Sequence, residues 1–404
     1  MTSINAAVLV LFTAGILLFA IPAAAQTPGE GKAFTVESSD GGFSLRLGSR
    51  FQIDNVFHGS DLSALGSDTA IRRAYLQISG GLLSDWNYKF QYDFARPGPH
   101  GDAVLGIRDA LIQYTGFDPF WITVGNFKEP LGLERLSGTL AATFIEYSLP
   151  DLFTPDRHVG TGAGYHGDGW TAALGVFGER PEDGITGEGA EAWDLAGRLT
   201  LLPVRGPGRL WHLGLVGRWH QANDSLHSLR FSSRPESNLT SVRLIDTGVL
   251  ADVDNYQTIG LEMLGIRGPC SLQGEYYYTR VNRAGSPDLA FSGWYVYGSW
   301  TLTGESRGYK TRSGLYDRME PERPVTTGGA GAWELALRYS TVDLSDGDII
   351  GGAQDDLTLG VNWYATGHLR LAVNYIRVLK LDRPGNAADG NNGDIVLMRW
   401  QVDF

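Results

Sequence analysis

The sequence lacks a second cysteine, a basic run and any second long apolar segment. The single cysteine, Cys270, excludes an internal disulfide. A net charge of −12 without a basic stretch argues against nucleic-acid binding, so no nucleic-acid partner is expected. No stretch after residue 25 has 18 apolar residues in a row, which excludes a transmembrane helix there.

The first 25 residues differ from the rest of the chain. Residues 6–21, AAVLVLFTAGILLFAI, form one apolar run, and Ala23-Ala24-Ala25-Gln26 follows Pro22. Small residues at 23 and 25 fit cleavage before Gln26. An uncleaved anchor helix is the alternative, because the start lacks Lys and Arg, but roughly 16 apolar residues fall short of the ~20 that a span needs. We therefore predict a signal peptide over residues 1–25 and a flexible polar segment over residues 26–42.

Glycine and aromatic residues are abundant: 54 Gly, 17 Phe, 17 Tyr and 11 Trp. They occur in segments that alternate with period two. In WNYKFQYDF, residues 86–94, aromatic rings share one face, and Asn87, Lys89, Gln91 and Asp93 share the other. Alternation over about ten residues with aromatic strand ends is the pattern of an outer-membrane barrel, whose closed sheet satisfies every backbone group in lipid.

Sixteen such segments are recognisable, an even number, as a single-chain bacterial barrel requires. They begin near residues 43, 69, 86, 104, 120, 158, 170, 192, 209, 256, 271, 291, 332, 356, 368 and 394. We predict an all-β, transmembrane, antiparallel barrel over residues 43–404. Short turns alternate with long links near 58–68, 96–103, 128–157, 179–191, 222–255, 344–355 and 381–393, expected on the extracellular side.

Two long links need a separate explanation. In residues 121–155 the alternation stops after Pro130, and Leu133, Leu136, Leu140 and Phe144 follow at helical spacing. A surface loop with a helical turn is one interpretation; a loop folded into the barrel lumen is the other. Residues 303–331 are also long, although strand parity places them on the periplasmic side. Either the strand count is wrong there, or this turn also folds inward.

The last strand, DIVLMRWQVDF, alternates up to the terminal Phe404. A barrel closes by pairing its last strand with its first, so a complete terminal strand favours the barrel.

The glycines Gly162, Gly164 and Gly167 match G-x-G-x-x-G. A dinucleotide site would need a helix after this motif, whereas WTAALGVFG alternates as a strand, so we reject that site. His212 and His220 share a strand face but lie roughly 26 Å apart at ~3.3 Å per residue, which excludes a shared metal. We expect no metal, no other cofactor and no enzymatic activity.

Several stretches resemble the phosphate-selective porins O and P of Gram-negative outer membranes. They are RRAYLQISGGLLSDWNYKFQYDFA (72–95), DALIQYTGF (109–117), ITVGNFKEPLGLERL (122–136), SLQGEYYYTRVNR (271–283), SGWYVYGSWTLTGESRGY (292–309) and GAWELALRYSTVDL (331–344). The resemblance implies a sixteen-stranded trimeric barrel in the outer-membrane lipid, with inward-folded constricting loops and an Arg/Lys-lined lumen for phosphate-like anions. It also implies that the barrel-assembly machinery recognises the strand ending at Phe404.

The expected pore-lining residues follow from strand faces and from the resemblance. Face sorting gives nine basic candidates for the lumen: Arg46, Arg50, Arg73, Lys89, Arg198, Arg218, Arg338, Arg370 and Arg399. The resemblance adds Lys128 in FKEP and Arg307 in GESRGY, and places Arg72-Arg73 at a strand start. Because adjacent strand residues face opposite sides, we expect Arg72 at the rim. For each arginine the alternative is an ion pair that stabilises the wall.

The acidic residues argue against a strongly anion-selective lumen. Eight share the lumen face, and the 128–157 loop carries five acidic residues against Lys128, Arg135 and Arg157. The expected function is passive diffusion of small anions, with phosphate or polyphosphate as the solute. A general or weakly cation-preferring porin is the alternative, and an outer-membrane barrel enzyme is a remote one.

Overall fold

The computed structural model describes residues 34–59, 68–95, 106–181, 192–222, 228–240, 242–385, 389–390 and 392–404. The predicted signal peptide, residues 1–25, lies outside these ranges. Within the described part of the chain, no helix has the length and apolarity needed to cross a membrane.

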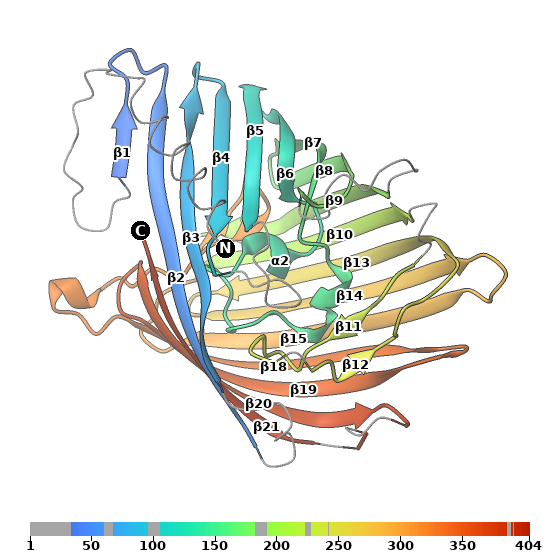
Figure 1. Ribbon diagram of the computed structural model, residues 1–404. Helices are drawn as coiled ribbons and strands as arrows, with labels where there is room; N and C mark the ends of the chain where they lie inside the picture. The colour runs from blue at the N-terminus through green and yellow to red at the C-terminus, as the bar shows by residue number, and fades with distance from the viewer. Residues whose placement is uncertain are drawn as a thin grey trace, which may run out of the picture.

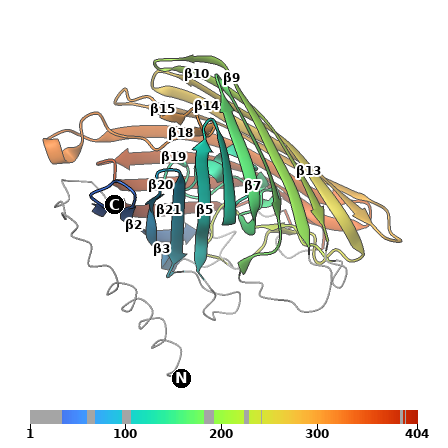
Figure 2. The ribbon, with the colours of Figure 1, turned by 90° about the horizontal axis from the view of Figure 1, so that it is seen from above.

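Sixteen antiparallel strands form one closed barrel, as predicted (Figures 1 and 2). They are β2 (Ser44–His58), β3 (Asp68–Leu82), β4 (Trp86–Asp93), β5 (Ile107–Phe117), β6 (Phe120–Lys128), β7 (Arg157–Gly167), β8 (Trp170–Phe177), β9 (Trp193–Gly206), β10 (Arg209–Gln221), β13 (Val253–Arg267), β14 (Cys270–Arg283), β15 (Leu289–Thr301), β18 (Ala332–Asp346), β19 (Ile349–Tyr364), β20 (Leu369–Asp382) and β21 (Asp394–Asp403). Each pairs with its neighbours in chain order.

The barrel closes between its last and first long strands. β21 pairs with β2 from Arg50↔Asp403 to His58↔Ile395. Beyond this register, the Ser49 amide donates to the Phe404 carbonyl over 3.1 Å, and the Phe404 amide donates to the Ser49 carbonyl over 3.2 Å. The terminal residue therefore takes part in closure.

Strand alternation separates an apolar outer surface from a polar interior. On β4, Trp86 and Phe90 are exposed, whereas Gln91 and Asp93 are buried. On β10, Leu213 and Leu215 are exposed and His212 is fully buried. In a water-soluble protein this exposed apolar surface would be unfavourable, so the outer wall suits contact with lipid.

The boundaries differ from the prediction most in two places. The expected long link at 344–355 is wrong, because β18 and β19 extend into it and only Gly347 and Asp348 lie between them. Gly351, Gly352 and a register shift at Asp355/Asp356 interrupt the apolar alternation there, which hides the strand in the sequence. In the 26–42 segment, β1 (Phe34–Glu37) pairs with β2, from Phe34↔Leu47 to Glu37↔Ser44. That part is a paired strand rather than a free segment.

The first unusual link and the β16–β17 part of the second fold into the barrel, and the strand count holds. The first link, residues 129–156 (here the constriction loop), contains α2 (Leu133–Ser137) and η2 (Leu149–Phe153), and α2 lies inside the barrel in Figure 1. The second, residues 302–331 (here the inward turn), contains β16 (Tyr309–Lys310), β17 (Leu315–Tyr316) and η4 (Val325–Thr327). Arg198 on β9 donates to the Gly314 carbonyl over 2.8 Å, which places the β16–β17 part of this turn in the lumen.

The apolar core lies between the constriction loop and the wall. Leu131, Ile145, Leu149 and Phe153 are at most 3% exposed and pack with residues of β10, β13 to β15 and β18 to β21. The segment 228–252, with β11 (Ser232–Ser233) and β12 (Ile245–Asp246), joins the same cluster through Phe231, Leu244, Ile245 and Leu250. One side of the lumen is therefore filled, and the open space is left beside the opposite wall.

Candidate functional site

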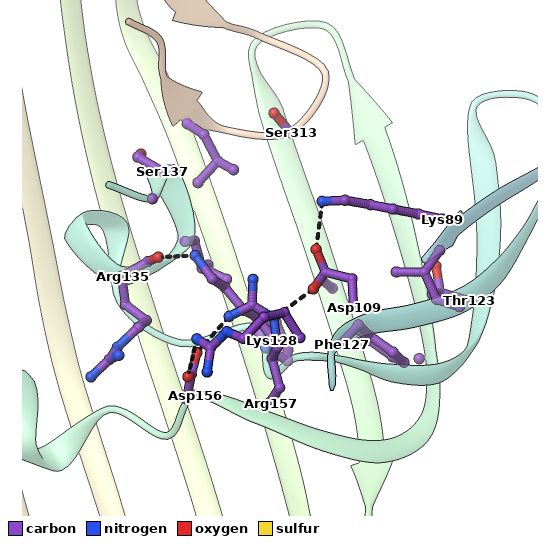
Figure 3. A pocket seen from close by; sticks show the side chains of 18 of the residues that line it. Lys89, Asp109, Thr123, Phe127, Lys128, Arg135, Ser137, Asp156, Arg157 and Ser313 are labelled. Atoms are coloured by element: carbon purple, nitrogen blue, oxygen red, sulfur yellow. Dashed lines mark hydrogen bonds and ion pairs between the residues drawn. The ribbon is translucent and has the colours of Figure 1, made fainter. Parts of the chain in front are cut away.

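The open space beside β2 to β9 is strongly basic. A cavity of about 490 Å³ lies between this wall, the constriction loop and the inward turn (Figure 3). The charged residues that line it are Arg50, Arg73, Lys89, Arg108, Lys128, Arg135, Arg157, Arg198, Lys310 and Arg318, against Asp109, Asp156 and Asp317.

Two further cavities adjoin this one. A cavity of about 340 Å³ shares Arg73, Arg108 and Arg135 with it and extends to residues 232–238 and Arg243. Another of about 430 Å³ shares Arg50 and Arg318 with it and reaches His368 and Phe404, at the barrel end that carries the C-terminus. Shared lining residues show that the three adjoin, so together they outline a route along the β2–β8 wall. Arg73 on the wall and Arg135 on the loop line both the first and the second cavity.

Arg72 does not lie at the rim, contrary to the prediction from strict alternation. The β2–β3 register shifts between Gln52↔Arg73 and Ile53↔Ile71, which leaves Arg72 as an extra residue on β3. A β-bulge of this kind re-aims a side chain. The Arg72 Nε accordingly lies 3.0 Å from Oε1 of Glu146 on the constriction loop. Both residues of the Arg72-Arg73 pair therefore point into the lumen.

A second bulge brings in Arg108, which sequence reasoning missed. The β4–β5 register shifts between Phe90↔Ala110 and Tyr92↔Ile107, so Arg108 and Asp109 together oppose Gln91. Arg108 pairs with Asp156, and Asp109 pairs with Lys89 and Arg157. At both bulges the sequence has two adjacent charged residues, Arg72-Arg73 and Arg108-Asp109, one of which falls on the apolar, outward-facing side of its strand. This was the signal that could have revealed the bulges.

Six of the eleven basic residues predicted for the lumen line the open route: Arg46, Arg50, Arg73, Lys89, Lys128 and Arg198. The Arg73 Nη1 donates to Gln52 Oε1 over 2.8 Å, the Arg50 Nη1 donates to Thr139 Oγ1 over 2.8 Å, and the Lys128 Nζ donates to the Arg135 carbonyl. Among the described residues, none of these three cations forms an ion pair with a carboxylate. Arg46 lines two adjoining cavities nearer the end that carries the C-terminus.

The other five, Arg218, Arg307, Arg338, Arg370 and Arg399, are buried and hold the inward segments. Arg218 pairs with Glu129 over 2.9 Å and with Asp194 over 2.8 Å. Arg338 pairs with Glu236 over 2.5 Å, and Arg307 pairs with Glu334 over 2.5 Å. Arg370 donates to the Ala142 carbonyl over 2.7 Å and to the Thr143 carbonyl over 2.6 Å. For these arginines the wall-stabilising alternative is the better description.

The constriction loop is also held by buried carboxylates. The Glu275 carboxylate accepts the first amides of α2, from Leu133 over 3.0 Å and from Glu134 over 2.7 Å. Burial would raise the pKa of Glu146, but Arg72, Arg399 and Arg73 hold it well below its usual value. Burial raises the pKa of Glu134 to about 7, although the charge of Arg338 opposes this shift.

One cluster has the residue types of a metal site. Ligand atoms of Glu129, His158 and Asp194 lie within 4.8 Å of one another. The Arg218 guanidinium, however, already pairs with both carboxylates. A bound cation would have to compete with this arginine, so the cluster is better described as the anchor of the loop's first residue.

The barrel resembles solved porins in fold. It aligns with the outer-membrane channel DcaP of Acinetobacter baumannii at a TM-score of 0.57 and 11% identity, covering 91% of this chain and 99% of that one. With an anion-selective porin from Comamonas acidovorans the TM-score is 0.54 at 15% identity, covering 90% and 100%.

Sequence comparison identifies the family of the chain as well as its fold. Porin O of Pseudomonas aeruginosa is 25% identical over 404 residues, which cover 91% of this chain and 90% of that protein. The family described as phosphate-selective porin O and P matches residues 45–404. Porins of this family are channels of the Gram-negative outer membrane, and the fold described above is the one that such a channel requires. The chain therefore belongs to the family of phosphate-selective porins O and P.

Proposed function

We propose that this outer-membrane channel passes small anions by diffusion and binds phosphate or polyphosphate at the constriction. The observation that supports this most directly is that Arg50, Arg73 and Lys128 face one cavity without a carboxylate partner among the described residues. Guanidinium and ammonium groups match phosphate oxygens, and rings of such cations select anions in a pore.

The acidic residues of the constriction loop do not cancel this charge, because each already has a basic partner. Glu129 pairs with Arg218, Glu134 with Arg338, Glu146 with Arg72 and Arg399, Asp151 with Arg135, and Asp156 with Arg108 and Arg157. On the wall, Asp109 is shared by Lys89 and Arg157. These are the carboxylates that argued against anion selectivity in the sequence. In the structure they form ion pairs that hold the loop.

The phosphate site can be tested by block of chloride current in planar bilayers. Phosphate should block the parent channel, and Lys128→Ala or Arg73→Ala should each relieve the block about tenfold, since a charge-assisted hydrogen bond contributes roughly 1.5–3 kcal/mol. Lys380→Ala is the matched control. Lys380 is exposed, lies near Asp382 at the C-terminal end of β20 and does not line the basic cavity.

Two outcomes would contradict the site. Equal block in the parent and both variants would move phosphate binding elsewhere, and no block in the parent would favour a general porin. A reversal potential showing cation preference in a salt gradient would remove anion selectivity altogether. An outer-membrane enzyme with a packed interior would show little conductance.

A further inference from the structure

Three alternate glycines on β7 face the lumen and carry no side chain into it. They are Gly160, Gly162 and Gly164, and their neighbours Val159 and Thr161 are exposed on the outer surface. The sequence motif around Gly162 and Gly164 resembles a nucleotide fingerprint but lies on a regular strand. Its glycines need a different explanation.

Each of these glycines lies under an aromatic ring from a neighbouring strand. A Cβ at Gly164 would come within 2.1 Å of Trp121, one at Gly162 within 3.2 Å of Phe127, and one at Gly160 within 2.6 Å of Phe177. The rings of Phe127 and Phe177 are themselves 5.1 Å apart, edge to face. At Gly160 and Gly164 a side chain would overlap a ring, and at Gly162 it would press against one, so the glycines leave room for this row of rings on the lumen wall.

The row borders the basic cavity. Trp121, Phe127 and Phe177 all line it, and Leu136 and Leu140 of the constriction loop line it as well. Phe177 is buried, whereas Trp121 and Phe127 keep part of their surface exposed to the cavity. Phe127 immediately precedes Lys128, and Figure 3 shows both side chains at the same cavity.

This arrangement is unusual for a channel lumen. The interior of such a barrel is normally polar, and apolar surface left in water is unfavourable unless something covers it. A concave site of a few hundred cubic ångströms with apolar walls and a few charged groups is the form that binds small organic molecules. Inorganic phosphate uses only the charged groups of such a site.

We propose that the preferred solute is a phosphate monoester with a planar apolar group. Its phosphate would lie at Lys128, Arg73 and Arg50, and its apolar group would pack on Phe127 and Trp121. This proposal rests on the phosphate site of the proposed function and adds the second half of the solute. An aryl phosphate has both parts.

The test compares two anions in the same current-block measurement. Phenyl phosphate should block chloride current in the parent at about a tenfold lower concentration than inorganic phosphate, the gain typical of one aromatic contact. In Phe127→Ser and in Trp121→Leu the ratio of the two blocking concentrations should fall towards one. Phe120→Ala is the matched control, because Phe120 is exposed on the outer face of the same strand and should leave the ratio unchanged.

Folding of each variant is checked by heat-resistant mobility on gels and by its conductance without added phosphate. Phe127→Leu provides a second variant that keeps the volume of the side chain and removes the ring. Benzoate supplies the ring without the phosphate and should block more weakly than phenyl phosphate.

The outcomes separate this proposal from the one on which it rests. If inorganic phosphate does not block the parent, both fail. If inorganic phosphate blocks and phenyl phosphate blocks no better, the aromatic row is only wall packing and this proposal alone fails. Equal block by benzoate and phenyl phosphate would overturn the assignment of a phosphate monoester.

Discussion

At the residue scale, arginines with similar burial have opposite roles. Arg73 and Arg338 are both less than 10% exposed. Arg338 is held by Glu236 and Glu134, whereas Arg73 contacts the neutral side chain of Gln52. A guanidinium that is neutralised by carboxylates adds little attraction for a passing anion, so the partner, more than the burial, decides which arginine can serve the solute.

Glu134 predicts a pH dependence of stability. Its pKa in the folded protein is about 7, above the ordinary value of 4.5, so the folded state holds the proton more tightly. The resulting stabilisation is complete below pH 4.5 and is lost as the pH rises through 7. Between about pH 5 and about pH 8 the parent should lose roughly 2–3 kcal/mol from this group.

Glu134→Gln isolates this contribution, because the amide oxygen can still accept the two hydrogen bonds from Ser148. The melting temperature of the detergent-solubilised protein should fall more steeply with pH in the parent than in the variant. Parallel pH profiles would show that Glu134 is charged throughout.

At the scale of elements, the constriction loop is attached to the wall and to the inward turn partly through its own carbonyls. Arg370 donates to the carbonyls of Ala142 and Thr143. Arg307 donates to the carbonyl of Ala141, and Arg399 donates to that of Ile145. Backbone carbonyls offer acceptors whatever the side chain is, so a loop of mixed sequence can still be held at a defined position. The carbonyls of Ala141, Ala142, Thr143 and Ile145 are satisfied in this way.

Arg370→Met should loosen this attachment. The variant loses the hydrogen bonds to Ala142 and Thr143 and a third, of 2.7 Å, to Asn362. Since such bonds contribute roughly 1.5–3 kcal/mol each, loop excursions should become at least about tenfold more frequent. Single-channel current fluctuations measure this. Arg377→Met on the same strand, where Arg377 pairs with Asp394, is the control, and equal noise in both variants would argue against a loop attachment through Arg370.

At the scale of the whole molecule, a closed barrel leaves no free strand edge, and its outer wall is apolar. We propose that three copies assemble, as the family resemblance implies. The protein lacking residues 1–25 should form heat-resistant trimers in detergent with a β circular-dichroism spectrum. Monomers at equilibrium in sedimentation would contradict the trimer, and a helical spectrum would contradict the fold.

Phe404 belongs to this scale because it ends the closing strand. Its side chain is exposed on the outer face, and its backbone pairs with Ser49. We predict that Phe404→Ala lowers the amount of folded protein in the outer membrane without changing the conductance of the channels that do assemble. The backbone pairing survives the substitution, while the side chain offered to the assembly machinery is lost. A parental amount of folded protein would refute this role.

The sequence by itself determined the class of fold, the number of strands and the face of most residues. These follow from local period-two alternation, which each strand carries independently of the others. Arg50, Arg73 and Arg46 could be placed in the lumen in this way. Lys128 was placed by resemblance.

Only the tertiary structure decided which cations remain open to a solute. The inward position of Arg72 and Arg108 depends on a bulge, which is defined by the register of two strands and not by either sequence alone. The pairing of Arg338 with Glu236 joins residues 102 positions apart. Such contacts form when separate loops fold into one lumen. Alternation along a single strand therefore cannot predict them.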